Sequence, residues 1–153
     1  MKYDLPYGMR FSILGRTFKR QLDQRLLEKD LTGVQLGVLK ELERLEAAGA
    51  AEVNQRDLEN ASHVTHPTMT EILKRLEKQG FISCHPGTKD RRYKCVSTTE
   101  KATQLLEEMV EVDKQIFAKL CTGLSGEQIS SLIAMTDVMI ENAGCTRKGK
   151  QKI

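Results

Sequence analysis

Apolar residues recur at helical spacing near both ends of the chain. At the N-terminal end they follow one another at steps of three and four residues, which predicts an amphipathic helix over residues 8–29. This stripe consists of Phe11, Leu14, Phe18, Leu22 and Leu26. A similar pattern predicts a long helix from Thr98 or Thr99 to Leu120. Its apolar face consists of Ala102, Leu105, Leu106, Met109, Val112 and Ile116.

Two sequence stretches have the spacing of a capping box, in which a hydroxyl and an amide satisfy the free N–H groups of a helix start. Thr32 and Gln35 form the first and begin a helix that Ala47–Ala51 ends. Ser125 and Gln128 form the second and begin the last helix. We expect that helix to bury Ile129, Leu132, Ile133, Met139 and Ile140.

The middle of the chain predicts two helices separated by a tight turn and followed by a hairpin. Asn54 is placed to cap a short helix over 55–61, and Thr65 is placed to cap a helix over 66–79 that Gly80 ends. Strands at 81–85 and 93–97 flank a charged loop. The fold class is mainly α with a small β-hairpin wing (α+β), which is a winged helix-turn-helix.

Positive charge is concentrated in one stretch of a nearly neutral chain. The 153 residues carry a formal net charge of +3. Residues 74–99 contain seven Lys or Arg and two acidic residues, whereas residues 100–141 contain three and eight. Such a stretch is typical of a nucleic-acid contact, and a solvated helix face followed by a turn is the alternative.

The second helix of a helix-turn-helix lies in the major groove and presents its N-terminal residues to base edges. The predicted recognition-helix contacts are Thr65, His66, Pro67, Thr68, Thr70, Glu71, Lys74 and Arg75. The hairpin loop adds charged residues suited to phosphates or to a narrow minor groove. These are Lys89, Asp90, Arg91 and Arg92, and we expect Asp90 to hold the loop through a salt bridge.

The order of these parts resembles the MarR family of bacterial transcription regulators, over about residues 10–143. The similarity is strongest at residues 31–35, at 65–70 with 76–82, and at Asp90-Arg91-Arg92 followed by 96–102. The resemblance implies a ligand-responsive repressor that acts as a homodimer on a pseudo-palindromic operator in double-stranded DNA. It also implies a small aromatic, acidic or lipophilic effector.

The resemblance further implies that the first helix and the last two helices interlock in the dimer. We therefore divide the chain into a dimerisation region, residues 1–30 and 99–145, a DNA-binding lobe, residues 31–98, and a disordered basic tail, residues 146–153. Long helices with apolar faces on a small chain also favour a dimer, because a second chain would shield these faces from water. The predicted dimer interface consists of Phe11, Leu14, Phe18, Leu22, Ile129, Leu132, Ile133 and Ile140.

Two cysteines in the hairpin suggest an alternative function, a thiol-sensing regulator. If the turn centres between Lys89 and Asp90, Cys84 and Cys95 lie opposite each other at a spacing compatible with a disulfide. The surrounding basic residues would lower a thiol pKa. A register shift of one residue would place the two side chains on opposite faces of the hairpin.

The sequence gives little support for an enzyme, a metal site or a membrane protein. No nucleophile elbow, P-loop, dinucleotide fingerprint or HExxH motif is present, so we expect no enzyme. The His and Cys spacings match no zinc pattern, and we expect no metal and no cofactor. With no apolar run near the ~18 residues of a membrane span, we expect a cytoplasmic protein. A dimeric protein-interaction module without DNA binding remains the other alternative.

Overall fold

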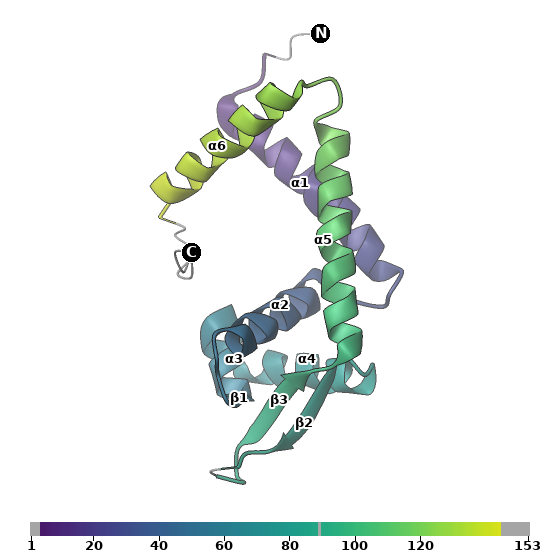
Figure 1. Ribbon diagram of the computed structural model, residues 1–153, viewed down its shortest axis with the longest axis vertical. Coiled ribbons are helices and arrows are strands. Elements are labelled where there is room, and N and C mark those ends of the chain that lie inside the picture. Colours follow the sequence, from purple (N-terminus) through teal and green to yellow (C-terminus); the bar gives the residue numbers. More distant parts are fainter. Residues whose placement is uncertain (1–3, 89, 145–153) are drawn as a thin grey trace. The chain divides into compact units, whose positions relative to one another are not determined.

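The computed structural model describes residues 4–88 and 90–144. Over these residues the chain forms six helices and one three-stranded antiparallel sheet (Figure 1). The elements are α1 (Tyr7–Leu27), α2 (Gly33–Ala47), β1 (Val53–Asn54), α3 (Gln55–Ser62), α4 (His66–Lys78), β2 (Ile82–Pro86), β3 (Lys94–Thr98), α5 (Glu100–Leu120) and α6 (Gly126–Asn142). This arrangement confirms the predicted winged helix-turn-helix fold class.

The chain divides into two units, residues 1–116 and residues 117–153. The first unit contains the sheet and α1 to α4, and the second contains α6. Helix α5 runs through the boundary. The predicted division of the chain at residues 30/31 and 98/99 stays a prediction. The predicted tail, residues 146–153, lies outside the described residues.

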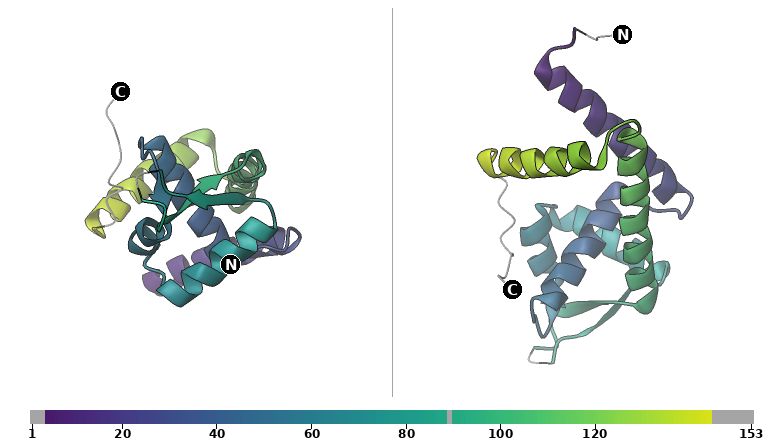
Figure 2. Two further views of the ribbon diagram at one scale, coloured as in Figure 1. Left: turned by 90° about the horizontal axis from the view of Figure 1, so that it is seen from below. Right: turned by 45° about the horizontal axis from the view of Figure 1, so that its top comes forward.

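The sheet has the order β1-β3-β2, so β3 is its central strand. The hairpin strands β2 and β3 each begin one residue later than the sequence indicates. The sequence pattern misses β1, because two residues are too few to show the alternation of a strand. β1 pairs with β3 through Val53, which lies opposite Val96. The hairpin projects beyond the helices of its unit (Figures 1 and 2).

Side chains cap three of the helices as reciprocal boxes. Thr32 with Gln35 and Ser125 with Gln128 form the two predicted boxes, and Asn54 forms a third with Asp57. Thr65 occupies the predicted N-cap position of α4, but its hydroxyl does not cap the helix. It donates instead to Thr68 Oγ1 at 3.0 Å. The prediction of a side-chain cap at Thr65 is therefore wrong.

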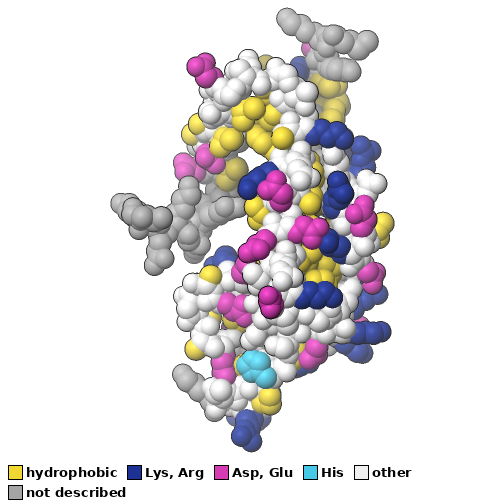
Figure 3. Space-filling view, turned by 45° about the vertical axis from the view of Figure 1, so that its right-hand side comes forward, with side chains coloured by type: hydrophobic (Ala, Val, Ile, Leu, Met, Phe, Trp, Pro, Cys, Tyr) yellow, Lys and Arg dark blue, Asp and Glu magenta, His cyan; other side chains and the backbone are white. Residues whose placement is uncertain are grey.

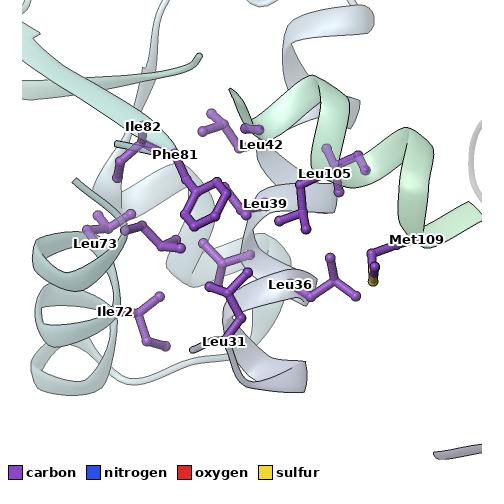
Figure 4. Packing of buried hydrophobic residues seen from close by; sticks show 14 of the residues in the cluster. Leu31, Leu36, Leu39, Leu42, Ile72, Leu73, Phe81, Ile82, Leu105 and Met109 are labelled. Carbon is purple, nitrogen blue, oxygen red and sulfur yellow. The ribbon is translucent and has the colours of Figure 1, made fainter. Parts of the chain in front are cut away.

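The core of the first unit joins the sheet to α2, α3, α4 and the first part of α5. Phe81 lies between α4 and α5, among leucine and isoleucine side chains from several elements (Figure 4). All six apolar residues predicted for α5 are buried. Leu26 near the end of α1 is fully buried, and Phe18 and Leu22 pack partly against the same cluster.

The C-terminal helix corrects one expectation. We expected α6 to bury Ile129, Leu132, Ile133, Met139 and Ile140, but no residue of α6 is buried. Ile133, Met139 and Ile140 are each about half exposed, at 47%, 47% and 50%. In α1, Phe11 and Leu14 are also half exposed. The periodicity predicts an apolar face, but it does not predict whether that face is buried.

None of the helices in residues 4–88 and 90–144 is long and apolar enough to cross a membrane.

Two adjacent leucines at the end of α1 test the core. Leu26 is fully buried and Leu27 is 75% exposed. We expect Leu26→Ala to lower the free energy of unfolding by about 2–5 kcal/mol, because it leaves a cavity. Leu27→Ala serves as the matched control and should change it by less than about 0.5 kcal/mol. Urea denaturation at one protein concentration measures both, and equal losses would contradict the packing described for α1.

Candidate nucleic-acid interface

Helices α3 and α4 form the helix-turn-helix. Leu58 of α3 and Met69 of α4 are both fully buried, which fixes the two helices on the core. The turn between them passes through His63, whose φ of 52° places it in the left-handed region. Asn, Asp and His adopt this conformation more readily than most residues. After this turn come the N-cap residue Thr65 and His66, the first residue of α4, which are both exposed.

Every predicted contact residue on α4 is exposed. Met69, Ile72, Leu73 and Leu76 point into the core and define the buried face of the helix. The remaining positions carry the predicted contacts, which are Thr65, His66, Pro67, Thr68, Thr70, Glu71, Lys74 and Arg75. One rigid helix thus presents short polar side chains at its N-terminal end and two basic side chains further along. This is the arrangement that base and phosphate contacts require.

Two residues of α3 hold the exposed end of α4, and sequence reasoning missed both. Gln55 Nε2 donates to Thr70 Oγ1 at 2.8 Å and to Glu59 Oε1 at 2.9 Å. Glu59 Oε1 also lies 2.7 Å from His66 Nδ1. Hydrogen bonds from Gln55 and His66 lower the pKa of Glu59, so its carboxylate is the acceptor. The i, i+4 spacing of Gln55 and Glu59 was the available signal.

The tip of the hairpin contains the predicted salt bridge. Arg92 Nη2 lies 2.8 Å from Asp90 Oδ2, and the Arg92 backbone N–H donates to Asp90 Oδ1 at 3.0 Å. Asp90 therefore has a lowered pKa, caused by its hydrogen bonds from Arg92. Within the described residues no carboxylate pairs with Arg91, and Lys89 lies outside them. Basic side chains mark this end of the molecule in Figure 3.

A second ion pair joins the hairpin to the recognition helix. Lys94 Nζ of β3 lies 3.3 Å from Glu77 Oε2 of α4. Hydrogen bonds from Cys84 and Lys94 lower the pKa of Glu77. The pair removes one positive charge from the basic stretch. Exposed cations of this stretch without a carboxylate partner in the described chain remain at Lys74, Arg75, Lys78 and Arg91.

The two hairpin cysteines do not lie opposite each other. Cys84 pairs with Val96, and His85 pairs with Cys95, so the register differs by one residue from the prediction. Neighbouring residues of a strand point to opposite faces, and the two thiols therefore lie on different faces of the sheet. The cause is the turn, where the Tyr93 N–H donates to the Asp90 carbonyl at 3.1 Å and the Gly87 N–H donates to the Tyr93 carbonyl at 2.9 Å.

The environment of each thiol is also different from the expectation. Burial and the neighbouring Glu77 raise the pKa of Cys84. Burial and the charge of Glu52 raise the pKa of Cys95. The expected lowering by the basic loop residues is therefore wrong. A thiol with a raised pKa has little thiolate at neutral pH and reacts slowly.

Known proteins share the sequence pattern and the fold of this lobe. The sequence profile of the MarR family matches residues 31–94. The winged lobe of this chain is thus similar in sequence to the MarR family. This match covers α2, α3, α4, β2 and the hairpin loop, which are the elements that present the candidate interface.

Solved structures share the MarR fold over most of the chain. MepR, a transcription regulator of the Staphylococcus aureus multidrug efflux pump MepA, is 24% identical, with a TM-score of 0.75 over 91% of this chain and 99% of MepR. A MepR variant bound to an oligodeoxyribonucleotide is 24% identical, with a TM-score of 0.69 over 92% and 99%. The reduced form of Escherichia coli MarR is 21% identical, with a TM-score of 0.71 over 89% and 97%.

The observed register leads to a direct expectation for oxidation. Treating the native chain with diamide should give no intramolecular disulfide between Cys84 and Cys95, because their side chains lie on different faces of the sheet. Peptide mapping by mass spectrometry without reduction measures this. The same treatment of the urea-denatured chain is the control and should allow the link. A Cys84–Cys95 peptide from native protein would contradict the register.

Proposed function

We propose that this chain is a transcriptional regulator that binds double-stranded DNA sequence-specifically as a homodimer. The observation that carries the proposal is the exposed polar end of α4, held by Gln55 and Glu59 and placed beside a projecting hairpin that presents Arg91. Thr65 to Glu71 would contact base edges in the major groove. Lys74, Arg75 and Arg91 would contact phosphates or the minor groove.

The uncovered apolar faces support a homodimer. Phe11 and Leu14 of α1 and Ile133 and Ile140 of α6 are each about half exposed. A soluble chain rarely leaves so many large apolar side chains in water unless another surface covers them. We infer that the partner is a second copy of this chain, which would bring two recognition helices to one pseudo-palindromic site.

A hollow in the first unit supports a small acidic effector and a repressor that responds to it. Its volume is about 400 Å³, within the range of small-molecule sites. Lys101 Nζ lies 4.6 Å from the centre of the Phe81 ring on its wall, and Lys29 forms a 2.7 Å salt bridge with Glu108 there. An aromatic carboxylate would compete for these cations. It would release DNA only if it prefers the non-binding state.

Fluorescence anisotropy tests the function directly. The purified protein is titrated onto the DNA upstream of its own gene and onto a scrambled duplex of the same composition, from low to high salt. Tighter binding to the first duplex and a steep salt dependence support the proposal. Equal binding to both would point to an operator elsewhere, which selection from random duplexes would find. An absence of binding in both experiments would favour the protein-interaction module.

Arg91 gives the sharpest test of the wing. We expect Arg91→Ala to weaken all duplexes and to reduce the slope of log K against log salt by about 0.9, the value for one lost phosphate contact. The matched control is Arg20→Ala, an exposed arginine of α1 outside the predicted interface. The same anisotropy titrations measure both variants. An unchanged slope in Arg91→Ala would remove the hairpin from the interface.

Ile133 tests the dimer. We expect the native chain to sediment as a dimer, and Ile133→Glu to sediment as a monomer because a charge would be buried at the interface. Val34→Glu is the control, since Val34 is exposed to a similar degree (55%) on α2. Analytical ultracentrifugation measures both. A dimer in Ile133→Glu, or a monomeric native chain, would contradict the proposed interface.

A further inference from the structure

Three potential metal ligands meet near the loop end of the hairpin strands. Glu52 immediately precedes β1, His85 lies in β2, and Cys95 lies in β3. One ligand atom from each side chain lies within 4.8 Å of the others. The cluster is separate from the exposed face of α4 and from the effector hollow. His85 and Cys95 come from one hairpin, and the pairing of β1 with β3 brings Glu52 to them from a segment much earlier in the sequence.

The strand register explains the meeting. His85 lies directly opposite Cys95, and residues opposite each other in an antiparallel pair point to the same face. On the other edge of β3, Asn54 is the partner of Cys95, and Glu52 lies two residues before Asn54. The central strand thus offers its thiol to a carboxylate on one side and to an imidazole on the other. Cys84 lies on the opposite face and takes no part.

Hydrogen bonds orient the two outer side chains. Glu52 Oε1 accepts the backbone N–H of Thr88 at 2.7 Å, and the same carboxylate also accepts hydrogen bonds from the side chains of Thr88 and Cys95. His85 Nδ1 lies 3.3 Å from the Pro86 carbonyl oxygen and Nε2 lies 3.2 Å from Ser97 Oγ. Metal-binding histidines commonly donate their second ring N–H to a backbone carbonyl. A proton on Nδ1, donated to Pro86, would make Nε2 an acceptor, and a metal ion at Nε2 would displace the Ser97 hydroxyl.

The hairpin loop packs closely against the thiol. A Cβ added to Gly87 would lie 3.4 Å from Cys95 Sγ and 2.7 Å from the Asp90 carbonyl oxygen. The approach to the Asp90 carbonyl requires glycine at this position, whereas the distance to Sγ is an ordinary contact. Cys95 itself is 3% exposed, and its neighbours include the carboxylates of Glu52 and Asp57. The thiol donates to Glu52, and a bound cation would take the place of that proton between the sulfur and the carboxylate.

We propose that Glu52, His85 and Cys95 bind one Zn²⁺ ion near the loop end of the hairpin strands. Sulfur, imidazole and carboxylate ligands together favour zinc over Mg²⁺ or Ca²⁺, which prefer oxygen ligands alone. Three protein ligands leave a fourth tetrahedral position for water. On binding, Cys95 releases its thiol proton to solvent, and the thiolate donates an electron pair to the metal.

The ion would join all three strands and, through Thr88 and Gly87, the base of the loop that carries Arg91. This consequence for DNA rests on the proposed function. A wing ordered before binding loses less conformational freedom on the duplex. We therefore expect Zn²⁺ to tighten duplex binding by roughly fivefold or more, the lower end of common coupling between sites.

Cobalt spectroscopy on the full chain tests the site without DNA. Reduced protein freed of metal by a chelator is titrated with Co²⁺, which gives a near-ultraviolet charge-transfer band only when a thiolate is bound. We expect one Co²⁺ per chain, strong visible absorption from tetrahedral geometry, and bleaching of both when Zn²⁺ is added. A native chain without the thiolate band would overturn the site.

Variants identify the ligands. Cys95→Ser should lose the charge-transfer band, and Cys84→Ser, the matched control on the other face, should keep it. Because Cys95 is buried, far-ultraviolet circular dichroism checks that its variant folds. Glu52→Gln keeps the side-chain size at a half-buried position and should weaken Zn²⁺ binding at least about tenfold, measured by competition with a chromophoric chelator. The same band in Cys95→Ser, or unchanged Zn²⁺ affinity in Glu52→Gln, would overturn the proposed ligand set.

Anisotropy with and without Zn²⁺ separates this inference from the proposed function. The native chain should bind the duplex more tightly with Zn²⁺, and Glu52→Gln should respond far less. Binding of Zn²⁺ without any duplex binding would contradict the regulator and leave the metal site standing. Duplex binding without Zn²⁺ binding would do the reverse. Zn²⁺ binding with unchanged duplex affinity would overturn the coupling between them.

Discussion

The buried face of α4 constrains the rest of the lobe. Met69, Ile72, Leu73 and Leu76 lie in the core, so the rotation of the helix about its axis is fixed by packing. The opposite face must then be exposed, and its residues are the short polar side chains and the two basic side chains of the candidate interface. Gln55 adds a second restraint from α3, since it donates to Thr70 on the exposed side. The buried face of α4 and the hydrogen bond from Gln55 therefore fix the orientation of the candidate interface.

The central strand β3 has a similar role on the other side of the lobe. It pairs with both neighbours, and its register decides which side chains can meet. A shift of one residue would place Cys84 opposite Cys95 and would take His85 away from it. The observed register instead separates the two thiols and gathers an imidazole, a carboxylate and one thiol. One register would pair the two thiols, and the other brings together the proposed metal ligands. The turn at Asp90 to Tyr93 fixes the second register.

Local signals carried the sequence prediction a long way. The spacing of apolar residues gave the buried face of α5 in full, and the capping residues at Thr32, Asn54 and Ser125 marked three helix starts. The features that the sequence did not predict depend on contacts between segments that are distant in the sequence. The two residues of β1 form a strand through their pairing with β3, which follows much later in the sequence. Glu59 contacts His66 because the turn between α3 and α4 brings the two helices together. The hairpin register depends on a loop geometry that charge and composition do not reveal.

The apolar face of α6 shows why a periodic pattern alone does not locate a core. Helical spacing predicts that one side of a helix avoids water, but it is silent on what covers that side. The apolar face of α5 packs into the core of the first unit, whereas Ile133 and Ile140 of α6 are about half exposed. A homodimer would cover them. Since only Thr99 separates β3 from α5, and its hydroxyl donates to the Gly80 carbonyl at 2.7 Å, α5 is tied directly to both the hairpin and the end of α4. A displacement of α5 by an effector beside Lys101 would therefore reach both parts of the candidate interface through short, rigid connections.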